Sequence, residues 1–385
     1  MNRPLLFPAF ANGGDINVLS GTPTFILEGA ALCGMALSPV CMPMPQEQPV
    51  ARWIWRMRRL AALKRPTGFT MSPDCLTAIW DRRGIFPAGS RIISTFALVS
   101  PRLLDRVENG ELELNFYVDA AFQQYVSTYG EHSQVDMDLA RRSFLLEERG
   151  FRLARNVFTF CEASSGYIAR RYGVPARTIL PGANISYSAL QHAQSLPRRQ
   201  SPQPFVVSFV GMDWERKGLS RIATAVTLLR GEGKNVILRV IGAAPPEIAS
   251  QPYVDFVGRV DKSRDMMRYA MLVRDSDLGI LMSDAEAFGL SPLESLALGV
   301  PVLATAVGGM PDYVRPDCGI LVDVQAPPHV LADKLRPLIA RGNEWQALAA
   351  GAEARMHELS WKATMQRMRR ELGDSSEEPA AVMAA

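Results

Sequence analysis

The sequence lacks the features that mark metal sites, disulfide frameworks and membrane spans. Its five cysteines are scattered and odd in number, and none has the spacing of a metal site, so we expect small buried side chains in a reducing compartment. No run of about 20 apolar residues is free of charge and proline, since the nearest one, Thr22 to Pro45, contains Glu28. No signal-peptide pattern is present either, and the expected location is the cytoplasm.

Strong charge and common cofactor motifs are also missing. The net charge of +3 is too small to indicate nucleic-acid binding. No Gly-x-Gly-x-x-Gly follows a strand-like run, which disfavours a nicotinamide-dependent oxidoreductase. No Asp-x-Asp pattern stands at a strand end, so we expect no metal and no cofactor.

The length and the apolar content indicate a two-domain α/β protein. A chain of 385 residues exceeds the roughly 250 to 300 beyond which single cores usually split, and 48% hydrophobic residues are enough for two cores. From Pro204 onward, short apolar runs alternate with helical spacing. This alternation predicts a parallel, doubly wound sheet covered on both faces. The predicted strands are 205–211, 236–241, 253–257, 278–282, 302–305 and 320–322.

The segment 283–302 places two carboxylates, Glu286 and Glu294, across a predicted strand-to-helix turn. Ser291 and Pro292 suggest the N-cap and the first residue of the helix. Ligands of open α/β sheets bind at the carboxyl ends of strands, where a helix N-terminus favours phosphate. Two structural alternatives remain open: Glu294 closing a capping box with Ser291, and Glu286 as a solvated loop carboxylate.

This segment resembles the Glu-x7-Glu signature of retaining glycosyltransferase family 4, also called glycosyltransferase group 1. Glu286 and Glu294 match the two glutamates, and Phe288, Gly289 and Leu290 match the turn between them. The resemblance implies a GT-B fold, in which two Rossmann-like domains face each other across a cleft. It also implies that Glu286 contacts the donor sugar and supports a cation-like transition state, whereas Glu294 holds the donor ribose.

Two further loops of the second half match the family. Lys217 stands where family members carry a lysine that binds the donor diphosphate, within the loop 211–218. Family members often carry an arginine directly after the first glycine of this loop, where this sequence has Met212. The role of that arginine would therefore pass to Arg216. By composition alone, adjacent cations on a loop are usually solvated.

The second loop contains Gly308 and Gly309, which match a Gly-Gly loop that borders the donor sugar; our candidate is Gly309. Asp312 replaces the glutamate that usually ends this loop. The alternative for the glycine pair is an ordinary tight turn.

The first half matches the family more weakly. A small-residue loop before an apolar helix resembles the glycine loop that opens GT-B N-terminal domains, and Gly21 is the candidate there. Family members often present a histidine to the donor sugar, but none of the four histidines follows a predicted strand end. Asp119, which does, is the candidate replacement; a turn or capping aspartate is the alternative.

We expect an N-terminal acceptor-side domain at 1–198, a nucleotide-sugar domain at 199–372 and a disordered tail at 373–385. The segment 52–65 interleaves arginines with tryptophans, as in a helix that lies on an anionic membrane. A surface helix that packs its tryptophans inward is the alternative.

The sequence therefore predicts a metal-independent, retaining glycosyltransferase of polysaccharide biosynthesis. Its donor would be a UDP-, GDP- or other nucleoside-diphosphate sugar, and its acceptor a glycan, a lipid-linked molecule or a small molecule. Partners would include no nucleic acid. A non-catalytic sugar-nucleotide-binding subunit of a polysaccharide assembly system is the alternative; an epimerase or a phosphorylase is less favoured.

Overall fold

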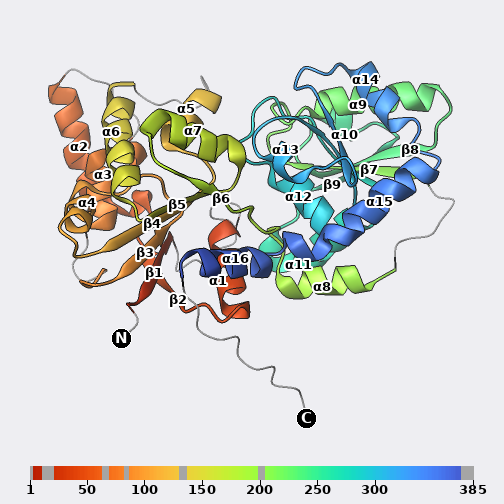
Figure 1. Cartoon of the computed structure of the whole chain (residues 1–385). Coiled ribbons are helices and arrows are strands. Elements are labelled where there is room, and N and C mark those ends of the chain that lie inside the picture. Colours follow the sequence, from red (N-terminus) through yellow and green to blue (C-terminus); the bar gives the residue numbers. More distant parts are fainter. Residues whose placement is uncertain are drawn as a thin grey trace, which may run out of the picture. The chain divides into compact units, whose positions relative to one another are not determined.

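The chain forms two compact units in the computed structural model (Figure 1). The structure describes residues 3–10, 21–62, 69–81, 86–129, 137–197 and 204–373. The first unit contains Met1–Ile179 and Met368–Ala385, and the second contains Leu180–Arg367. The boundary expected after residue 198 falls within the second unit, in a segment outside the described residues. Of the expected tail, only Gly373 is described.

The first unit is built on a six-stranded sheet in the order β2-β1-β3-β4-β5-β6. Every neighbouring pair is parallel. The strand order changes direction between β1 and β3, which places the switch point of the sheet between them. The strands are β1 Leu5–Phe10, β2 Leu37–Met42, β3 Arg91–Ser94, β4 Glu113–Val118, β5 Asn156–Thr159 and β6 Arg177–Thr178.

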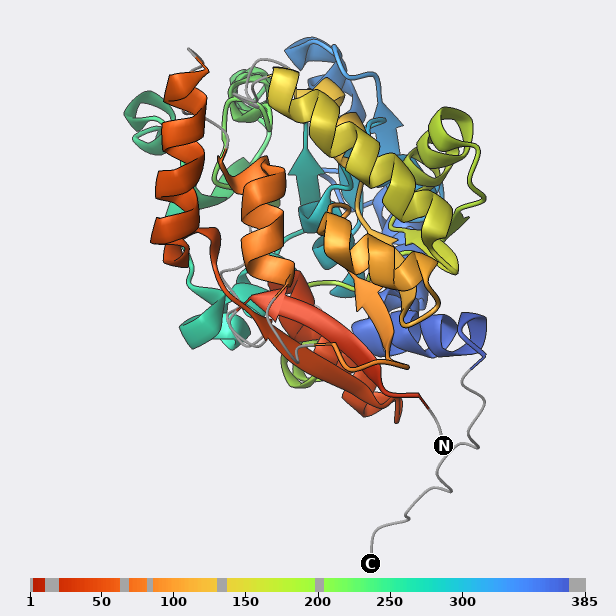
Figure 2. The ribbon, with the colours of Figure 1, turned by 90° about the vertical axis from the view of Figure 1, so that its left-hand side faces the viewer.

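Helices cover this sheet, and α2, α3, α4 and α6 lie along one side of it (Figure 2). Serines cap two of them: Ser72 Oγ accepts from the amide of Cys75, and Ser100 Oγ from that of Leu103, both at 3.1 Å. The helices are α1 Thr22–Leu32, η3 Pro45–Glu47, α2 Pro49–Ala61, η4 Phe69–Met71, α3 Pro73–Trp80, α4 Pro101–Glu108, α5 Phe122–Tyr129, α6 Met137–Leu153 and α7 Glu162–Tyr172.

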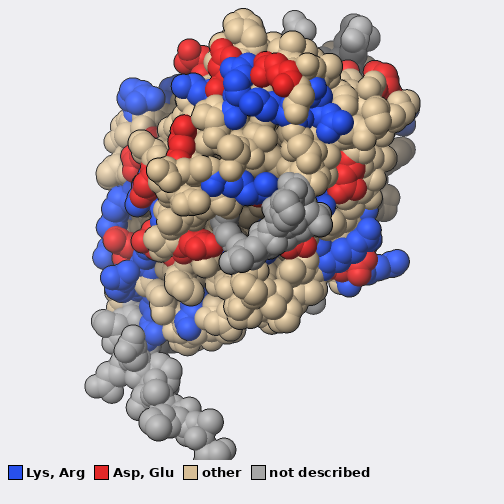
Figure 3. Space-filling view, turned by 90° about the vertical axis from the view of Figure 1, so that its right-hand side faces the viewer, with Lys and Arg blue, Asp and Glu red and all other residues tan. Residues whose placement is uncertain are grey.

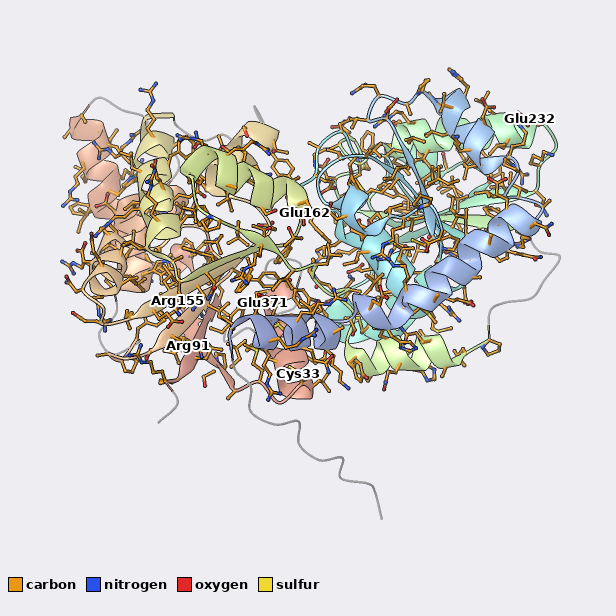
Figure 4. All side chains as sticks on the ribbon, in the orientation of Figure 1. Cys33, Arg91, Arg155, Glu162, Glu232 and Glu371 are labelled. Carbon is orange, nitrogen blue, oxygen red and sulfur yellow. The ribbon has the colours of Figure 1, made fainter. Side chains whose placement is uncertain are left out.

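The last helix, α16 Trp361–Glu371, ends in the first unit. Polar contacts fasten this end: Arg369 donates to the carbonyl of Cys33 at 2.8 Å, and Arg91 donates to the carbonyl of Leu372 at 3.1 Å. Figure 4 labels Arg91, Cys33 and Glu371 around it. The C-terminal segment therefore completes the first unit.

The second unit has a six-stranded sheet in the order β12-β11-β10-β7-β8-β9, again parallel throughout. All six predicted strands are present, and the α/β class is confirmed. The order changes direction between β7 and β10, the expected position of a ligand site. The strands are β7 Phe205–Gly211, β8 Val236–Gly242, β9 Val254–Gly258, β10 Leu278–Leu281, β11 Val302–Thr305 and β12 Gly319–Val322.

The helices of the second unit are α8 Tyr187–Ser195, α9 Leu219–Gly231, α10 Pro246–Ala249, α11 Lys262–Arg274, α12 Leu290–Ala297, α13 Met310–Tyr313, α14 Pro328–Leu335, α15 Asn343–Arg355, η6 Met356–Leu359 and the first part of α16. Lys and Arg lie close to Asp and Glu over the face shown in Figure 3. Among the ion pairs of this unit, Arg336 pairs with Glu232 and Asp333. Among the described residues, no helix has the length and apolar character needed to cross a membrane.

The start of α12 differs from the sequence-based expectation. Its N-cap is Gly289, which has a φ of 89° and makes no side-chain cap bond. Ser291 and Pro292 are therefore the second and third residues of the helix, and the predicted N-cap at Ser291 is wrong. Pro292 is tolerated because an amide in the first turn has no acceptor within the helix.

Candidate functional site

The loops that follow β7 and β10 are joined at the switch point of the second sheet. The amide of Asp284 donates to the carbonyl of Arg216 at 2.9 Å, and the amide of Met282 donates to the carbonyl of Lys217 at 3.3 Å. Side chains add to this connection, because Arg216 Nη1 donates to Glu286 Oε1 at 2.9 Å. The structure thus brings Arg216, Lys217 and Glu286 together, as the sequence predicted.

Two glycines make this approach possible. Gly218 has a φ of 71°, and a Cβ there would lie 2.3 Å from the carbonyl oxygen of Met282. At Gly211, the last residue of β7, a Cβ would lie 2.5 Å from Cδ of Lys217. The absence of both side chains lets the loop close on β10 and lets the Lys217 stem cross the strand end.

Lys217 is the unpaired cation of this region. The side chain is half-buried, and within the described part of the chain its ammonium group has no hydrogen bond and no ion pair. Desolvation lowers the pKa of Lys217, while the nearby charge of Glu286 opposes that shift. A partly desolvated ammonium without a carboxylate partner is well suited to an anionic ligand.

Glu286 is held from two sides. Its Oε1 accepts from Ser283 Oγ at 3.0 Å and from Arg216, and its side chain is 11% exposed. The alternative of a solvated loop carboxylate is therefore wrong. Arg216 also pairs with Asp213 at 2.8 Å, so this guanidinium orients Glu286 rather than standing free.

Glu294 lies deeper and has partners that the sequence analysis missed. It is 3% exposed, and its Oε1 accepts from Lys262 Nζ at 2.7 Å. Its Oε2 accepts from the hydroxyl of Tyr269, and Lys262 Nζ lies 4.0 Å from the centre of the Tyr269 ring. Burial and the Glu294 charge raise the pKa of Tyr269 well above its usual value. Because Glu294 bonds to α11 and not to the N-cap amide, the capping-box alternative is also wrong.

The residues between the two glutamates form the support of the turn. Phe288 is buried, with its ring centre 5.2 Å from that of Tyr313. The Tyr313 hydroxyl donates to the carbonyl of Gly289, and Leu290 begins α12. Phe288 and Gly289 therefore fix the turn through packing and backbone conformation, and they leave its amides at the carboxyl edge of the sheet.

Of the paired glycines, Gly308 is the one whose backbone conformation and surroundings require a glycine. Its φ is 60°, and a Cβ would lie 2.4 Å from the carbonyl oxygen of Glu286. Gly309, the candidate chosen from the sequence, has an ordinary φ of −85° and precedes α13. The pair is therefore more than a generic tight turn, because Gly308 packs directly against the backbone of the signature loop.

Gly308→Ala is expected to destabilise the protein by about 1–3 kcal/mol, since it combines backbone strain with a contact that forces Glu286 to move. Gly309→Ala should change stability by less than about 1 kcal/mol. Urea unfolding of the two variants gives this comparison directly. If both variants lost the same free energy of unfolding, Gly308 would not be the position that requires a glycine.

Gly21 and Asp119 belong to the first unit. Gly21 has a φ of 82° and is the N-cap of α1, but residues 11–20 of its loop lie outside the described part. Asp119 directly follows β4; its Oδ1 accepts from the amide of Ala120 at 2.8 Å, and its side chain is otherwise exposed. Asp119 therefore stands at the carboxyl edge of the first sheet, where β4 ends. No cluster of three or more His, Cys, Asp or Glu side chains suited to a metal ion occurs among the described residues.

Part of the chain is similar in sequence to known glycosyltransferases. Residues 204–341 match the family model described as Glycosyl transferases group 1. A D-inositol 3-phosphate glycosyltransferase from Segniliparus rotundus is 30% identical over 173 residues, covering 42% of this chain and 38% of that protein. The chain thus spans well under two thirds of that relative's length.

Solved structures show the same fold. Sucrose-phosphate synthase from Thermosynechococcus elongatus has a TM-score of 0.65 at 18% identity, covering 97% of this chain and 100% of the other. HepE from Anabaena, solved with UDP and glucose, has a TM-score of 0.60 at 14% identity, with 97% and 100% covered. The two doubly wound sheets are those of the GT-B fold, as predicted.

Proposed function

We propose that this chain, whose residues 204–341 match the group 1 glycosyltransferase model, transfers a sugar from a nucleoside-diphosphate donor to an acceptor hydroxyl, with retention of configuration and without a metal. The acceptor would be a glycan, a lipid-linked molecule or a small molecule. The observation that carries the proposal is the unpaired Lys217 beside Glu286 at the switch point of the second sheet.

The chemistry assigned to Lys217 is stabilisation of the leaving group. As the bond between the sugar and the diphosphate breaks, negative charge grows on the phosphate oxygens. The Lys217 ammonium and the free amides at the start of α12 are fixed donors that can bind this charge without reorganising. Such electrostatic preorganisation is a reason to propose catalysis without a metal.

The two glutamates would act at opposite ends of the donor. Glu286, oriented by Arg216 and Ser283, would bind the sugar hydroxyls and support positive charge at the anomeric carbon. Glu294 would accept from the ribose. A carboxylate has about four acceptor positions, so Glu294 can keep Lys262 and Tyr269 and still accept another hydrogen bond.

The remaining candidates have supporting roles in this proposal. Phe288, Gly289 and Leu290 shape the turn whose amides face the phosphates. Gly309 would border the donor sugar, and Gly21 would border the acceptor side of the site. Asp119 would take the place of the missing histidine and bind a hydroxyl of the acceptor or the donor sugar.

A donor panel tests the proposal. UDP-sugars come first because HepE was solved with UDP and glucose, followed by GDP-, ADP- and TDP-sugars. We expect one donor class to raise the melting temperature, and that donor to be slowly hydrolysed or transferred. Binding without turnover would favour the non-catalytic subunit. No binding by any donor would contradict both functions.

We also propose peripheral contact with the inner face of a membrane through α2. Val50, Trp53, Met57 and Leu60 share one face of the helix and are exposed, with Trp53 63% exposed. Trp55, by contrast, is 4% exposed and packs against Phe69 at a ring distance of 5.6 Å. The inward-packing alternative thus holds for one tryptophan only. An apolar face flanked by arginines suits an anionic bilayer.

Replacing Arg52 and Arg56 with glutamine should weaken binding to phosphatidylserine-containing vesicles about 30-fold, at ~1 kcal/mol for each charge near the surface. Cosedimentation at fixed lipid concentration measures the change. Arg264→Gln is the matched control, because Arg264 is an exposed arginine of α11 in the second unit. Equal binding by the double variant and the control would exclude α2 as the contact.

A further inference from the structure

The first unit contains a pocket of about 400 Å³ at the carboxyl edge of its sheet. Phe10 ends β1 and Met42 ends β2, Thr95 to Leu98 directly follow β3, and Asp119 with Ala120 directly follow β4. The pocket therefore spans the switch point between β1 and β3. Ligands of parallel sheets bind in this position.

The walls of the pocket are mainly apolar. Helix α3 contributes Leu76, Ile79 and Trp80, and the loop after β3 contributes Phe96. The rings of Phe10 and Phe96 lie 5.0 Å apart, and that of Trp80 lies 6.2 Å from Phe96. An aromatic wall packed against itself keeps its shape when empty, so the pocket is preorganised for an apolar group.

A fixed helix end forms another part of the wall. Phe122 and Tyr125 line the pocket from α5. The buried Glu147 accepts from the amides of Phe122 and Gln123 in the first turn of α5. Tyr172 donates to the same carboxylate at 2.5 Å. Because the free amides of the helix start are satisfied by a buried side chain, α5 is held in place behind the pocket.

The pocket lining has few polar groups, and they indicate a ligand with a hydroxyl group. Thr95 Oγ1 is buried and, within the described part of the chain, has no hydrogen-bond partner. Among the described residues that line the pocket, Asp119 is the one carboxylate, and none is a lysine or an arginine. A buried hydroxyl without a partner is costly, and a ligand hydroxyl would remove that cost.

We propose that this pocket binds the acceptor through an aliphatic or aromatic group, with the acceptor hydroxyl held between Thr95 and Asp119. The inference rests on the proposed glycosyl transfer and names its acceptor class as amphiphilic. A phosphorylated polyol is disfavoured, because its phosphate would meet the Asp119 carboxylate, and no described residue of the lining carries a positive charge. The acceptor named in the D-inositol 3-phosphate glycosyltransferase is thus not expected to bind here.

Alkyl glucosides of increasing chain length test the pocket. Calorimetric titration with hexyl, heptyl and octyl β-glucoside, below their micelle concentrations, should show affinity rising about fourfold per added methylene until the pocket is full. Inositol 3-phosphate should not compete. Ala97→Phe, which places a ring in the lining, should lower octyl glucoside affinity at least tenfold. Phe256→Ala, at an exposed phenylalanine of the second unit, is the matched control.

Affinity independent of chain length in the wild-type protein would overturn the inference, and this arm requires no variant to fold. Octyl glucoside binding that Ala97→Phe and Phe96→Ala both leave unchanged would overturn it as well. Donor binding is measured separately on each protein. If a pocket variant loses alkyl glucoside binding while the donor still raises its melting temperature, the substitution acts on the pocket and not on the fold as a whole. Chain-length dependence in a protein that binds no donor would contradict glycosyl transfer and leave the apolar site standing.

Discussion

Replacing Lys217 with alanine is expected to lower kcat/KM for transfer by about 100- to 1,000-fold, the range found when one fixed donor to a developing negative charge is removed. The effect is large because Lys217 has no carboxylate partner within the described residues and is partly desolvated. Arg216, already bonded to Asp213 and Glu286, cannot turn to replace it without releasing both. Initial rates over a range of donor concentrations separate kcat from KM.

Lys334→Ala is the matched control for these rate measurements, because it removes an exposed lysine of α14. A drop shared by kcat and kcat/KM would mean that Lys217 acts on the transition state, whereas a rise in KM alone would mean that it binds the donor uniformly. If Lys217→Ala retained turnover within threefold of Lys334→Ala, the diphosphate would have to lie elsewhere.

The strands of the second unit could be predicted because parallel strands covered on both faces are nearly continuous apolar runs. Val207, Leu278 and Leu303, for instance, are all fully buried in the middle of the sheet. The same pattern placed the loops after β7 and β10 at strand ends, but only the resemblance to the glycosyltransferase family joined them into one site. That their strands are neighbours is seen in the structure alone.

The partners of Glu294 could not be predicted, because they depend on how α11 packs against α12. Lys262 and Tyr269 stand on either side of a kink at Asp265, where the backbone of α11 leaves the helical conformation. Helical spacing therefore could not show that both side chains reach Glu294. The start of α12 was misplaced for a related reason. Ser291 is a favourable N-cap residue, yet the positive φ of Gly289 starts the helix earlier.

In the first unit, too, contacts that depend on how elements pack could not be predicted from the sequence, both on the surface and in the pocket. Trp53 and Trp55 have similar neighbours in the sequence, and only the packing of Trp55 against Phe69 of η4 distinguishes the buried Trp55 from the exposed Trp53. The pocket joins Phe10, Trp80 and Phe96 from three separate segments. Neither helical nor strand periodicity contains information about such long-range contacts.

Replacing Glu294 with alanine is expected to lower the free energy of unfolding by about 3 kcal/mol, in addition to weakening donor binding. The loss arises because the variant leaves the Lys262 ammonium and the buried Tyr269 hydroxyl without their acceptor. Breaking a buried ion pair costs about 3–5 kcal/mol, and the low end applies because Lys262 is partly exposed. Urea unfolding monitored by circular dichroism measures the change.

A double replacement separates the structural role of Glu294 from its role with the donor. Glu294→Leu combined with Lys262→Met removes both charges, so its stability should exceed that of Glu294→Ala by at least 1 kcal/mol. Donor binding should remain weak in both, because neither offers a carboxylate to the ribose. If the double variant bound donor as well as the wild type, Glu294 would serve only to fasten α12 to α11, and the ribose partner would have to be sought among other residues of the second unit.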